Sequence, residues 1–340
     1  MLDLSVLEKF DTQQMYKVYE RWPEIARESF ESDQDSVNFD GIDHIVFAGM
    51  GGSGAICDMF ASILSKTKIH VNVVKGYLLP KTVDSNTLVV AVSVSGNTAE
   101  TLFVLDSAHN LGCKIIAFSS GGKMQEYCAK NKIEHRIIPQ SHSPRASFPA
   151  FLFSILRVLE PFLLIKRNDI TDSLDELEKQ RGKISSSNLG DENPAISLAK
   201  WISDIPLIYY PWGLQAGAIR FKNSLQENAK MHAMTEDIIE ACHNGIVSWE
   251  RPSTVKPILI QGYDDYIKTK ERWKILKEFF EGKEIDYHEI HTVSGSIISK
   301  LINLVYLLDY ATIYRAVLSN IDPTPVGPID FVKKKLNSQI

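Results

Sequence analysis

Cysteine is scarce in this sequence, and the spacing of the few cysteines excludes several kinds of site. Four occur in 340 residues, with no C-x-x-C pair and no zinc-finger spacing: Cys57, Cys113, Cys128 and Cys242. We therefore expect buried free thiols rather than disulfides or a metal centre. The nine histidines show no H-x-x-x-H or H-E-x-x-H spacing either, so we expect no metal ligands.

The chain also lacks a basic surplus and a long uninterrupted apolar run. It has 37 Lys and Arg against 42 Asp and Glu, a net charge of −5, which argues against nucleic-acid binding. The apolar stretch from Phe148 to Ile165 falls short of a membrane span, because prolines and charges interrupt it. The N-terminal residues show no basic-then-apolar secretory pattern. We expect a soluble, cytoplasmic protein with neither nucleic-acid nor membrane partners.

What the sequence does have is enough apolar residues, 44%, and enough length for about two domains. Residues 1–40 are predicted to form a helical, polar extension. After it, helical patterns alternate with short apolar strands at 44–48, 70–74, 87–95, 114–120 and 134–139, and again at 205–211, 256–263 and 284–293. This alternation predicts parallel sheets covered on both faces. We predict an α/β fold of two similar α-β-α sandwich domains, residues 1–150 and 151–340.

A glycine-rich loop, Gly49-Met-Gly-Gly-Ser-Gly54, follows the first predicted strand and opens a helix. Glycines let the backbone approach a ligand, and the helix offers unpaired N–H groups to an anion, which makes Gly52 and Ser53 candidate phosphate ligands. A tight turn without function is the plain alternative. The letters also satisfy the dinucleotide pattern G-x-G-x-x-G, but Val74-Lys75-Gly76 stands where that pattern needs a ribose-binding acid.

A second polar loop, Ser93-Val-Ser-Gly-Asn-Thr-Ala-Glu-Thr101, lies where an apolar strand ends and a helix begins. Its hydroxyls and the helix dipole suit a phosphate group, with Ser93, Ser95 and Thr98 as candidate ligands. The plain alternative is that Asn97 or Thr98 caps the helix. Both loops follow parallel strands, so we expect them to meet at the carboxyl edge of one sheet, where such folds bind ligands.

The two loops together resemble the sugar isomerase (SIS) domain, which binds phosphosugars. Three further stretches narrow the resemblance: SPRASF at 143–148, QENAKMHA at 226–233 with ACHNGIVSWE at 241–250, and IDPTPVGPIDFVKKKL at 321–336. From about residue 40 to its end the chain is similar to the bifunctional phosphoglucose/phosphomannose isomerases of the phosphoglucose isomerase superfamily. This implies two SIS-type domains. Gly245 and Ser248 depart from that family's pattern, in which an acid often follows His-Asn and a glycine often precedes the Trp.

The resemblance assigns roles to individual residues. Glu227 matches the catalytic glutamate, which moves a proton between C1 and C2 of the sugar through a cis-enediolate. Arg145 matches the arginine that stabilises the enediolate charge. His243 matches the ring-opening histidine, which in this superfamily comes from the neighbouring subunit and so implies a homodimer. Without the motifs, these would be read as a surface glutamate, a loop arginine and a structural histidine.

Two more implied site residues lie near the C-terminus. The resemblance places a ring-opening lysine in the last helix, at Lys333 or, as the runner-up, Lys334. Thr324 matches a threonine near the substrate, small enough to allow rotation about C2–C3 so that glucose and mannose 6-phosphate both form. A solvated lysine run and a turn threonine are the plain alternatives. A carboxylate-based enediol mechanism requires no metal or other cofactor.

We therefore expect an isomerase of glucose, mannose and fructose 6-phosphates that acts on a small-molecule phosphosugar. The nearest alternative is another SIS-type isomerase, for pentose or heptose phosphates. A phosphosugar-binding protein without catalysis is an alternative of a different class, although the 40-residue extension is small for the DNA-binding domain that such sensors carry. A dehydrogenase remains a minor alternative because of the glycine pattern.

Overall fold

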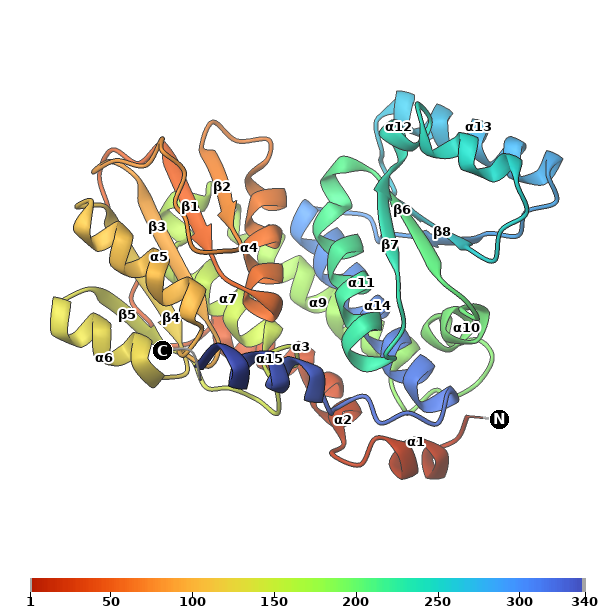
Figure 1. Ribbon diagram of the computed structural model, residues 1–340, viewed down its shortest axis with the longest axis horizontal. Helices are drawn as coiled ribbons and strands as arrows, with labels where there is room; N and C mark the ends of the chain where they lie inside the picture. Colours follow the sequence, from red (N-terminus) through yellow and green to blue (C-terminus); the bar gives the residue numbers. More distant parts are fainter. Residues whose placement is uncertain (1, 338–340) are drawn as a thin grey trace.

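Two parallel sheets flanked by helices form the structure, a computed structural model that describes residues 2–337 (Figure 1). The first sheet has the order β2-β1-β3-β4-β5, and all its pairs are parallel. Its strands are β1 (His44–Ala48), β2 (His70–Val74), β3 (Leu88–Ser93), β4 (Lys114–Ser119) and β5 (Glu134–Ile137). The helices beside it are α4 (Gly51–Leu64), α5 (Ala99–Asn110) and α6 (Gly122–Asn131).

The central strands of this sheet are buried on both faces, as their continuous apolar sequences predict. Successive side chains of a strand point to opposite faces, so β1 contributes to two cores. Ile45 and Phe47 join the larger core, and Val46 and Ala48 join a smaller one beneath α5 and α6. Strands β1 and β3 are neighbours in register, which brings the loops that follow them to one edge.

The second sheet has the order β7-β6-β8-β9 and is also parallel. Its strands are β6 (Pro206–Tyr210), β7 (Met234–Asp237), β8 (Lys256–Gln261) and β9 (His288–His291). The sequence did not predict β7, a polar edge strand of only four residues, and β9 is shorter than the predicted 284–293. Helices of different lengths surround the sheet: η1 (Trp212–Leu214), α11 (Gln215–Asn228), α12 (Ile238–Ala241), η2 (Gly245–Glu250) and α13 (Ile267–Gly282).

A helical layer joins the two sheets and contains α14 (Ile297–Leu318) at its centre. This helix packs against α9 (Arg167–Ile184), α10 (Pro194–Trp201) and α11. Two shorter helices, α7 (Phe148–Val158) and α8 (Glu160–Leu163), precede α9. By length and composition α14 alone among the described helices could cross a membrane, but 83% of its apolar window is buried inside the protein, as in a core helix.

The N-terminal extension is helical, as predicted, between residues 4 and 30, whereas residues 31–40 form no helix, and only one side of the extension is polar. Its helices are α1 (Leu4–Phe10), α2 (Met15–Glu20) and α3 (Trp22–Phe30). Trp22 is fully buried and stacks on Tyr19, Tyr306 and Phe148, with ring centroids 4.3, 5.5 and 5.9 Å away. The prediction of a polar extension therefore holds for one side only, because it overlooked an aromatic face that packs on α7 and α14.

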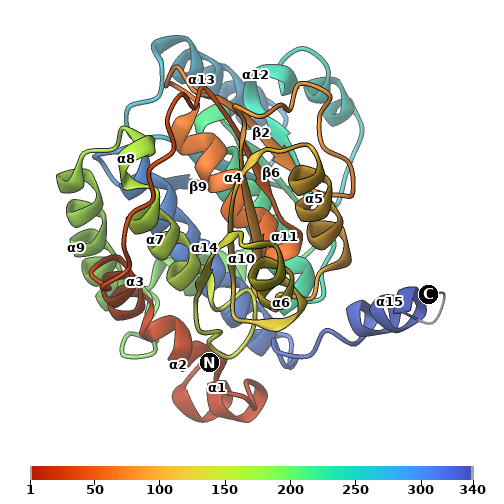
Figure 2. The ribbon, with the colours of Figure 1, turned by 90° about the vertical axis from the view of Figure 1, so that its left-hand side faces the viewer.

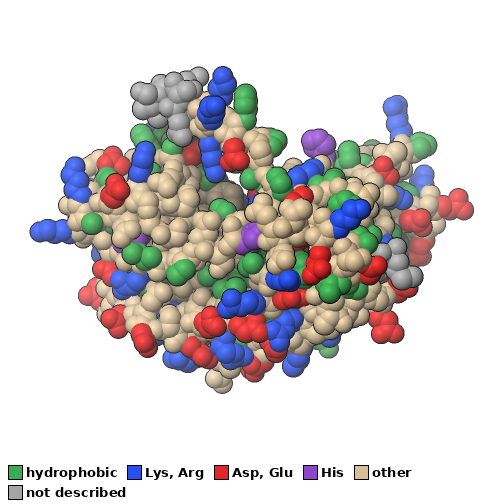
Figure 3. Space-filling view, turned by 90° about the horizontal axis from the view of Figure 1, so that it is seen from below, with side chains coloured by type: hydrophobic (Ala, Val, Ile, Leu, Met, Phe, Trp, Pro, Cys, Tyr) green, Lys and Arg blue, Asp and Glu red, His purple; other side chains and the backbone are tan. Residues whose placement is uncertain are grey.

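The last helix, α15 (Gly327–Asn337), stands away from the body of the chain (Figure 2). Seen from below, this C-terminal segment is an arm separated from the main surface by a gap (Figure 3). Every residue from 327 to 336 is exposed. Ile329, Val332 and Leu336 form an exposed stripe at helical spacing, and Lys333 lies at its edge.

The predicted α/β fold with two parallel sheets is confirmed. The domain boundary at residue 150 stays a prediction. All four cysteines are free, and two of them, Cys57 and Cys128, are buried as expected. The other two, Cys113 and Cys242, are only half-buried.

Candidate active site

The two predicted phosphate loops meet at the carboxyl edge of the first sheet, as expected from parallel strands. The backbone N–H of Val94 donates to the Ser53 hydroxyl at 3.1 Å, which joins the loop after β3 to the start of α4. Gly96 is required here, because its φ is +67° and a Cβ would lie 1.8 Å from the Gly121 carbonyl oxygen. The loops at this edge of the sheet are therefore closely packed. As at any helix N-terminus, the first backbone N–H groups of α4 have no acceptor within the helix.

The five predicted phosphate ligands differ in their exposure. Ser53 and Ser93 are buried, and the Ser93 hydroxyl donates to that of Thr98 at 3.0 Å. Ser95 is exposed and accepts from the Asn97 N–H at 3.3 Å, and Thr98 is partly exposed. Thr98 is the N-cap residue of α5, yet its side chain caps no backbone N–H. The capping alternative therefore does not explain its hydroxyl, and a role in phosphate binding stays a prediction.

Arg145 lies beside the glycine loop and is almost fully buried. A Cβ on Gly52 would lie 3.3 Å from the carbonyl oxygen of Pro144, so the two loops are in close contact. The guanidinium donates from Nε to Asn228 Oδ1 at 2.7 Å and from Nη2 to the carbonyl oxygens of Pro323 and Thr324, each at 2.8 Å. Arg145 is thus a rigidly held cation, not a solvated loop arginine.

Glu227, near the C-terminus of α11, faces this cation. Its Oε2 lies 3.3 Å from Arg145 Nη1, and its side chain is 26% exposed against 6% for Arg145. Four of the five guanidinium N–H groups have protein acceptors, and the fifth is on Nη1, next to the carboxylate. A base and a free cationic donor therefore lie together, beside loops suited to an anion, which is what proton transfer from an anionic substrate requires.

A short segment, Asp322–Pro325, closes one side of the Arg145–Glu227 pair; we call it the strap. It contains Thr324, whose side-chain oxygen is buried and has no hydrogen-bond partner among the residues that the structure describes. Lys230 donates from Nζ to the carbonyl oxygens of Pro323 and Pro325 at 3.2 and 2.7 Å, and also to that of Glu227. Desolvation, and then the Arg145 charge, lower the pKa of Lys230. The side chains of Arg145 and Lys230 thus hold the strap through its carbonyl oxygens.

Sequence reasoning missed three residues that hold this geometry: Asn228, Lys230 and Asp322. All three stand inside motifs that the resemblance had already singled out, QENAK and IDPTP. Their roles could not be predicted from the sequence, because each acts through a residue distant in sequence. Asn228, for example, also donates to the Thr312 hydroxyl of α14 at 2.8 Å.

A buried ion pair supports the site from below. Arg220 on α11 donates from Nη2 to Asp309 on α14 at 2.6 Å, and the side chains are 3% and 0% exposed. The same nitrogen donates to the carbonyl oxygen of Arg145 at 2.9 Å. Ser224 and Tyr19 donate to the Asp309 carboxylate at 2.8 and 3.2 Å. This network connects α2, α11 and α14 to the backbone of Arg145.

His243 and Lys333 do not join the cluster within this chain. His243 is exposed and follows α12, which lies at the top of Figure 1, whereas the C-terminal segment lies at the bottom; Figure 2 agrees. Lys333 and Lys334 are both exposed on the projecting α15. Of the six residues assigned to chemistry or to the sugar, Arg145, Glu227 and Thr324 are therefore brought together, and His243, Lys333 and Lys334 are not.

At Gly245, which departs from the family pattern, the end of a flexible side chain occupies the neighbouring space. An ideal Cβ on Gly245 would lie 2.4 Å from Glu236 Oε1, so the carboxylate of β7 fills the space beside this glycine. Burial, and then the neighbouring Glu240, raise the pKa of Glu236. Ser248 is a surface residue that donates to the Gly245 carbonyl oxygen at 2.7 Å.

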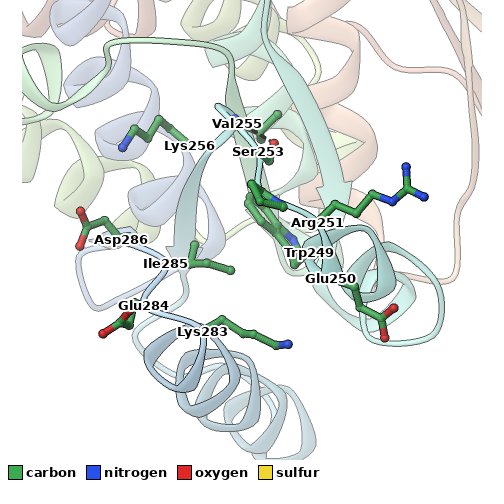
Figure 4. Close-up of a pocket in the computed structure, with 11 residues that line it drawn as sticks. Trp249, Glu250, Arg251, Ser253, Val255, Lys256, Lys283, Glu284, Ile285 and Asp286 are labelled. Atoms are coloured by element: carbon green, nitrogen blue, oxygen red, sulfur yellow. Dashed lines mark hydrogen bonds between the residues drawn. The ribbon is translucent and has the colours of Figure 1, made fainter.

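A separate pocket of about 420 Å³ in the second domain contains none of the predicted site residues. Figure 4 shows Trp249 and Ile285 on its walls, with the charged side chains spread around its rim. Its residues precede β8 and β9, so it lies at the amino edge of the second sheet, whereas ligands of such folds bind at the carboxyl edge. Within residues 2–337 no group of three or more His, Cys, Asp or Glu is placed to hold a metal ion.

Comparisons with known proteins show what the chain is similar to. Residues 191–336 match the bacterial phospho-glucose isomerase C-terminal SIS domain, and residues 40–159 match the SIS domain. A bifunctional phosphoglucose/phosphomannose isomerase of Caldicellulosiruptor bescii is 32% identical over 337 residues, covering 95% of this chain and 98% of that protein. A D-glucosamine-6-phosphate 4-epimerase of Sulfolobus acidocaldarius is 32% identical over 68% of this chain and 72% of its own.

Solved structures share the fold at lower identity. The tagatose-6-phosphate ketose/aldose isomerase of Escherichia coli superposes with a TM-score of 0.69 at 14% identity. The match covers 93% of this chain and 96% of that chain. At this identity the likeness concerns the fold alone.

Proposed function

The chain belongs to the bifunctional phosphoglucose/phosphomannose isomerases, and from this premise we propose that it interconverts glucose 6-phosphate and mannose 6-phosphate with fructose 6-phosphate. The observation that carries the proposal is the Arg145–Glu227 pair, with Nη1 and Oε2 3.3 Å apart beside the two polar loops. A sugar-phosphate isomerase needs a base that removes a proton from a sugar carbon, a cation that stabilises the resulting oxyanion, and a site that binds the phosphate. The chain brings residue types suited to all three to one edge of the first sheet.

In the proposed reaction the Glu227 carboxylate takes the C2 proton of the open-chain aldose. The electrons of the broken C–H bond form the C1=C2 bond, and the carbonyl oxygen at C1 takes up the negative charge of a cis-enediolate. Arg145 stabilises this charge through its unpaired Nη1 donor. Glu227 then delivers a proton to C1, either the one it took or one exchanged with solvent, and the O2 proton moves to O1, which yields fructose 6-phosphate without a change in the number of atoms.

We assign the phosphate to the two loops, with Gly52, Ser53, Ser93, Ser95 and Thr98 as its surroundings. Hydroxyls and helix N-termini hold a phosphate dianion with few formal positive charges, so a net charge of −5 is no obstacle. Thr324 on the strap is assigned to the sugar, because its buried hydroxyl lacks a protein partner. The bound sugar would supply that partner.

His243 and Lys333 are assigned to ring opening, and His243 to the site of a second subunit. Supporting this, the His243 side chain is exposed in its own chain. The exposed apolar stripe of α15 also favours a homodimer, since an isolated 11-residue helix is marginal in water. We prefer Lys333 to Lys334 because Lys333 borders that stripe. Four free thiols agree with the reducing cytoplasm as the proposed compartment.

The direct test is turnover of glucose, mannose and fructose 6-phosphates by the pure protein. Glu227→Gln, which keeps the shape of the side chain and removes the base, is expected to abolish isomerisation while phosphosugar binding persists. Glu278→Gln, on the exposed face of α13, is the control and is expected to retain activity. Turnover of glucosamine 6-phosphate alone, with epimerisation at C4, would instead favour the activity of the Sulfolobus relative.

The subunit assignment is tested by mixing two inactive variants, Glu227→Gln and His243→Ala, by co-expression. If His243 acts on the partner's site, each mixed dimer contains one intact site, and about a quarter of wild-type activity returns. If His243 acts within its own chain, the mixture stays inactive. That outcome would refute the assignment.

A further inference from the structure

The strap has no backbone support of its own. Across the part of the chain that the structure describes, residues 322–325 form no backbone–backbone hydrogen bond, and two of the four are prolines without an N–H group. Arg145 and Lys230 grip the strap only through its carbonyl oxygens. Its position therefore depends on side chains, and the placement of the buried Thr324 hydroxyl depends on them too.

Within residues 2–337, Asp322 alone supplies a side-chain hydrogen bond to an N–H group of the strap. Its Oδ1 accepts from the backbone N–H of Thr324 at 2.8 Å, which forms a local turn. Its Oδ2 accepts from the Thr12 hydroxyl at 2.5 Å, across 310 residues of sequence. One carboxylate thus connects the strap to the N-terminal extension.

Hydrogen bonds hold the turn that contains Thr12 in place. It lies in the turn between α1 and α2, where the fully buried Asp11 accepts from the N–H groups of Met15 and Tyr16 at 2.9 and 2.8 Å. Two tyrosines of α14 donate to backbone carbonyl oxygens of α2, Tyr306 to Tyr19 at 2.8 Å and Tyr310 to Tyr16 at 3.2 Å. The turn is therefore fixed to the same helix, α14, whose C-terminus leads into the strap.

We propose that Thr12 and Asp322 are positioning residues that set the place of Thr324, and hence the balance between glucose and mannose 6-phosphate. The inference rests on the proposed function for its kinetic part. The Thr12 hydroxyl orients the Asp322 carboxylate, the carboxylate holds the Thr324 N–H, and the Thr324 carbonyl oxygen meets Arg145. Without the Thr12 hydroxyl the strap keeps its contacts with Arg145 and Lys230 but no longer has one fixed position. The substrate is then bound but poorly aligned for the reaction.

The test compares Thr12→Val, which deletes the hydroxyl and keeps the shape, with Thr12→Ser, which restores the donor. Thr171→Val is the matched control, because Thr171 is an exposed threonine on α9 whose hydroxyl donates to a helix carbonyl. We expect Thr12→Val to lower kcat about tenfold, corresponding to one lost hydrogen bond to a charged acceptor, with little change in KM. The ratio of mannose to glucose 6-phosphate turnover shifts as well, and Thr12→Ser and Thr171→Val keep wild-type values.

A second measurement does not depend on activity. Hydrogen exchange of a peptide covering residues 320–327 reports the Thr324 N–H in the free protein, and we expect faster exchange in Thr12→Val but not in Thr12→Ser. Unchanged exchange overturns the proposal, as does a loss of activity that follows a lower melting temperature with an unaltered substrate ratio. A wild-type protein that turns over neither aldose refutes the proposed function, while the exchange result still decides the role of Thr12.

Discussion

The buried Arg220–Asp309 pair allows a quantitative test of how the site is supported. Asp309→Ala leaves the Arg220 guanidinium in a site where its side chain is 3% exposed, with no anion in contact. Removing one partner of such a pair costs about 3–5 kcal/mol of unfolding free energy. Tyr19 and Ser224 each lose an acceptor as well, which adds up to about 1 kcal/mol per hydroxyl. We therefore expect a loss of about 4 kcal/mol or more.

Urea denaturation followed by tryptophan fluorescence measures this loss. With a denaturant slope of about 3 kcal/mol/M, a loss of 4 kcal/mol lowers the urea midpoint by about 1.3 M. Asp191→Ala is the matched control, because it deletes an aspartate whose partner, Lys200, lies on the surface, and exposed pairs contribute little. Equal midpoints for the two variants would refute the reasoning, since they would mean that the buried carboxylate does not hold Arg220.

Three further predictions follow from single contacts. Arg145→Lys keeps the charge and loses the fork that reaches Asn228 and the strap, so kcat is expected to fall about 100-fold in the isomerase assay; a near-normal kcat would mean that charge alone suffices. Gly96→Ala places a Cβ 1.8 Å from a carbonyl oxygen and is expected to abolish phosphosugar binding measured by calorimetry, whereas Gly112→Ala, with a similar φ but open space, is expected to retain it. Burial lowers the pKa of His142 below 6.5, with Asp11, Arg145 and Asp322 as its charged neighbours, so the unfolded chain takes up the proton first and stability falls as the pH drops below about 6.5. His142→Asn is expected to reduce that fall in melting temperature between about pH 7.5 and 5.5, and parallel curves for variant and wild type would contradict it.

The first sheet was predictable because its central strands are continuous apolar runs, each followed by a loop with a distinct composition. Strand β7 was not, since Met234-Thr-Glu-Asp has no strand pattern and becomes a strand only by pairing with β6. The buried face of the N-terminal extension, with Tyr19 and Trp22, was hidden among charged residues that face solvent. Edge pairing and one-sided burial are tertiary effects that a local pattern does not contain.

The candidate site also contains features that the sequence predicted and features that it did not. The sequence predicted that the loops at 49–54 and 93–101 lie close together, because adjacent parallel strands bring the loops that follow them to one edge of the sheet. The pairing of Arg145 with Glu227, 82 residues apart, came only from the resemblance and is matched by a 3.3 Å contact. The contact between Thr12 and Asp322 could not be predicted, since it exists only once the N-terminal turn packs on α14.

The most direct test of the central claim is proton exchange during turnover in deuterated water. Fructose 6-phosphate is incubated with the wild-type protein and with Glu227→Gln, and the sugars are examined by proton NMR. The account predicts that deuterium enters C1 of the ketose and C2 of the aldoses with the wild-type protein, and that Glu227→Gln exchanges neither position. Exchange or isomerisation at the wild-type rate in Glu227→Gln would contradict proton transfer by Glu227.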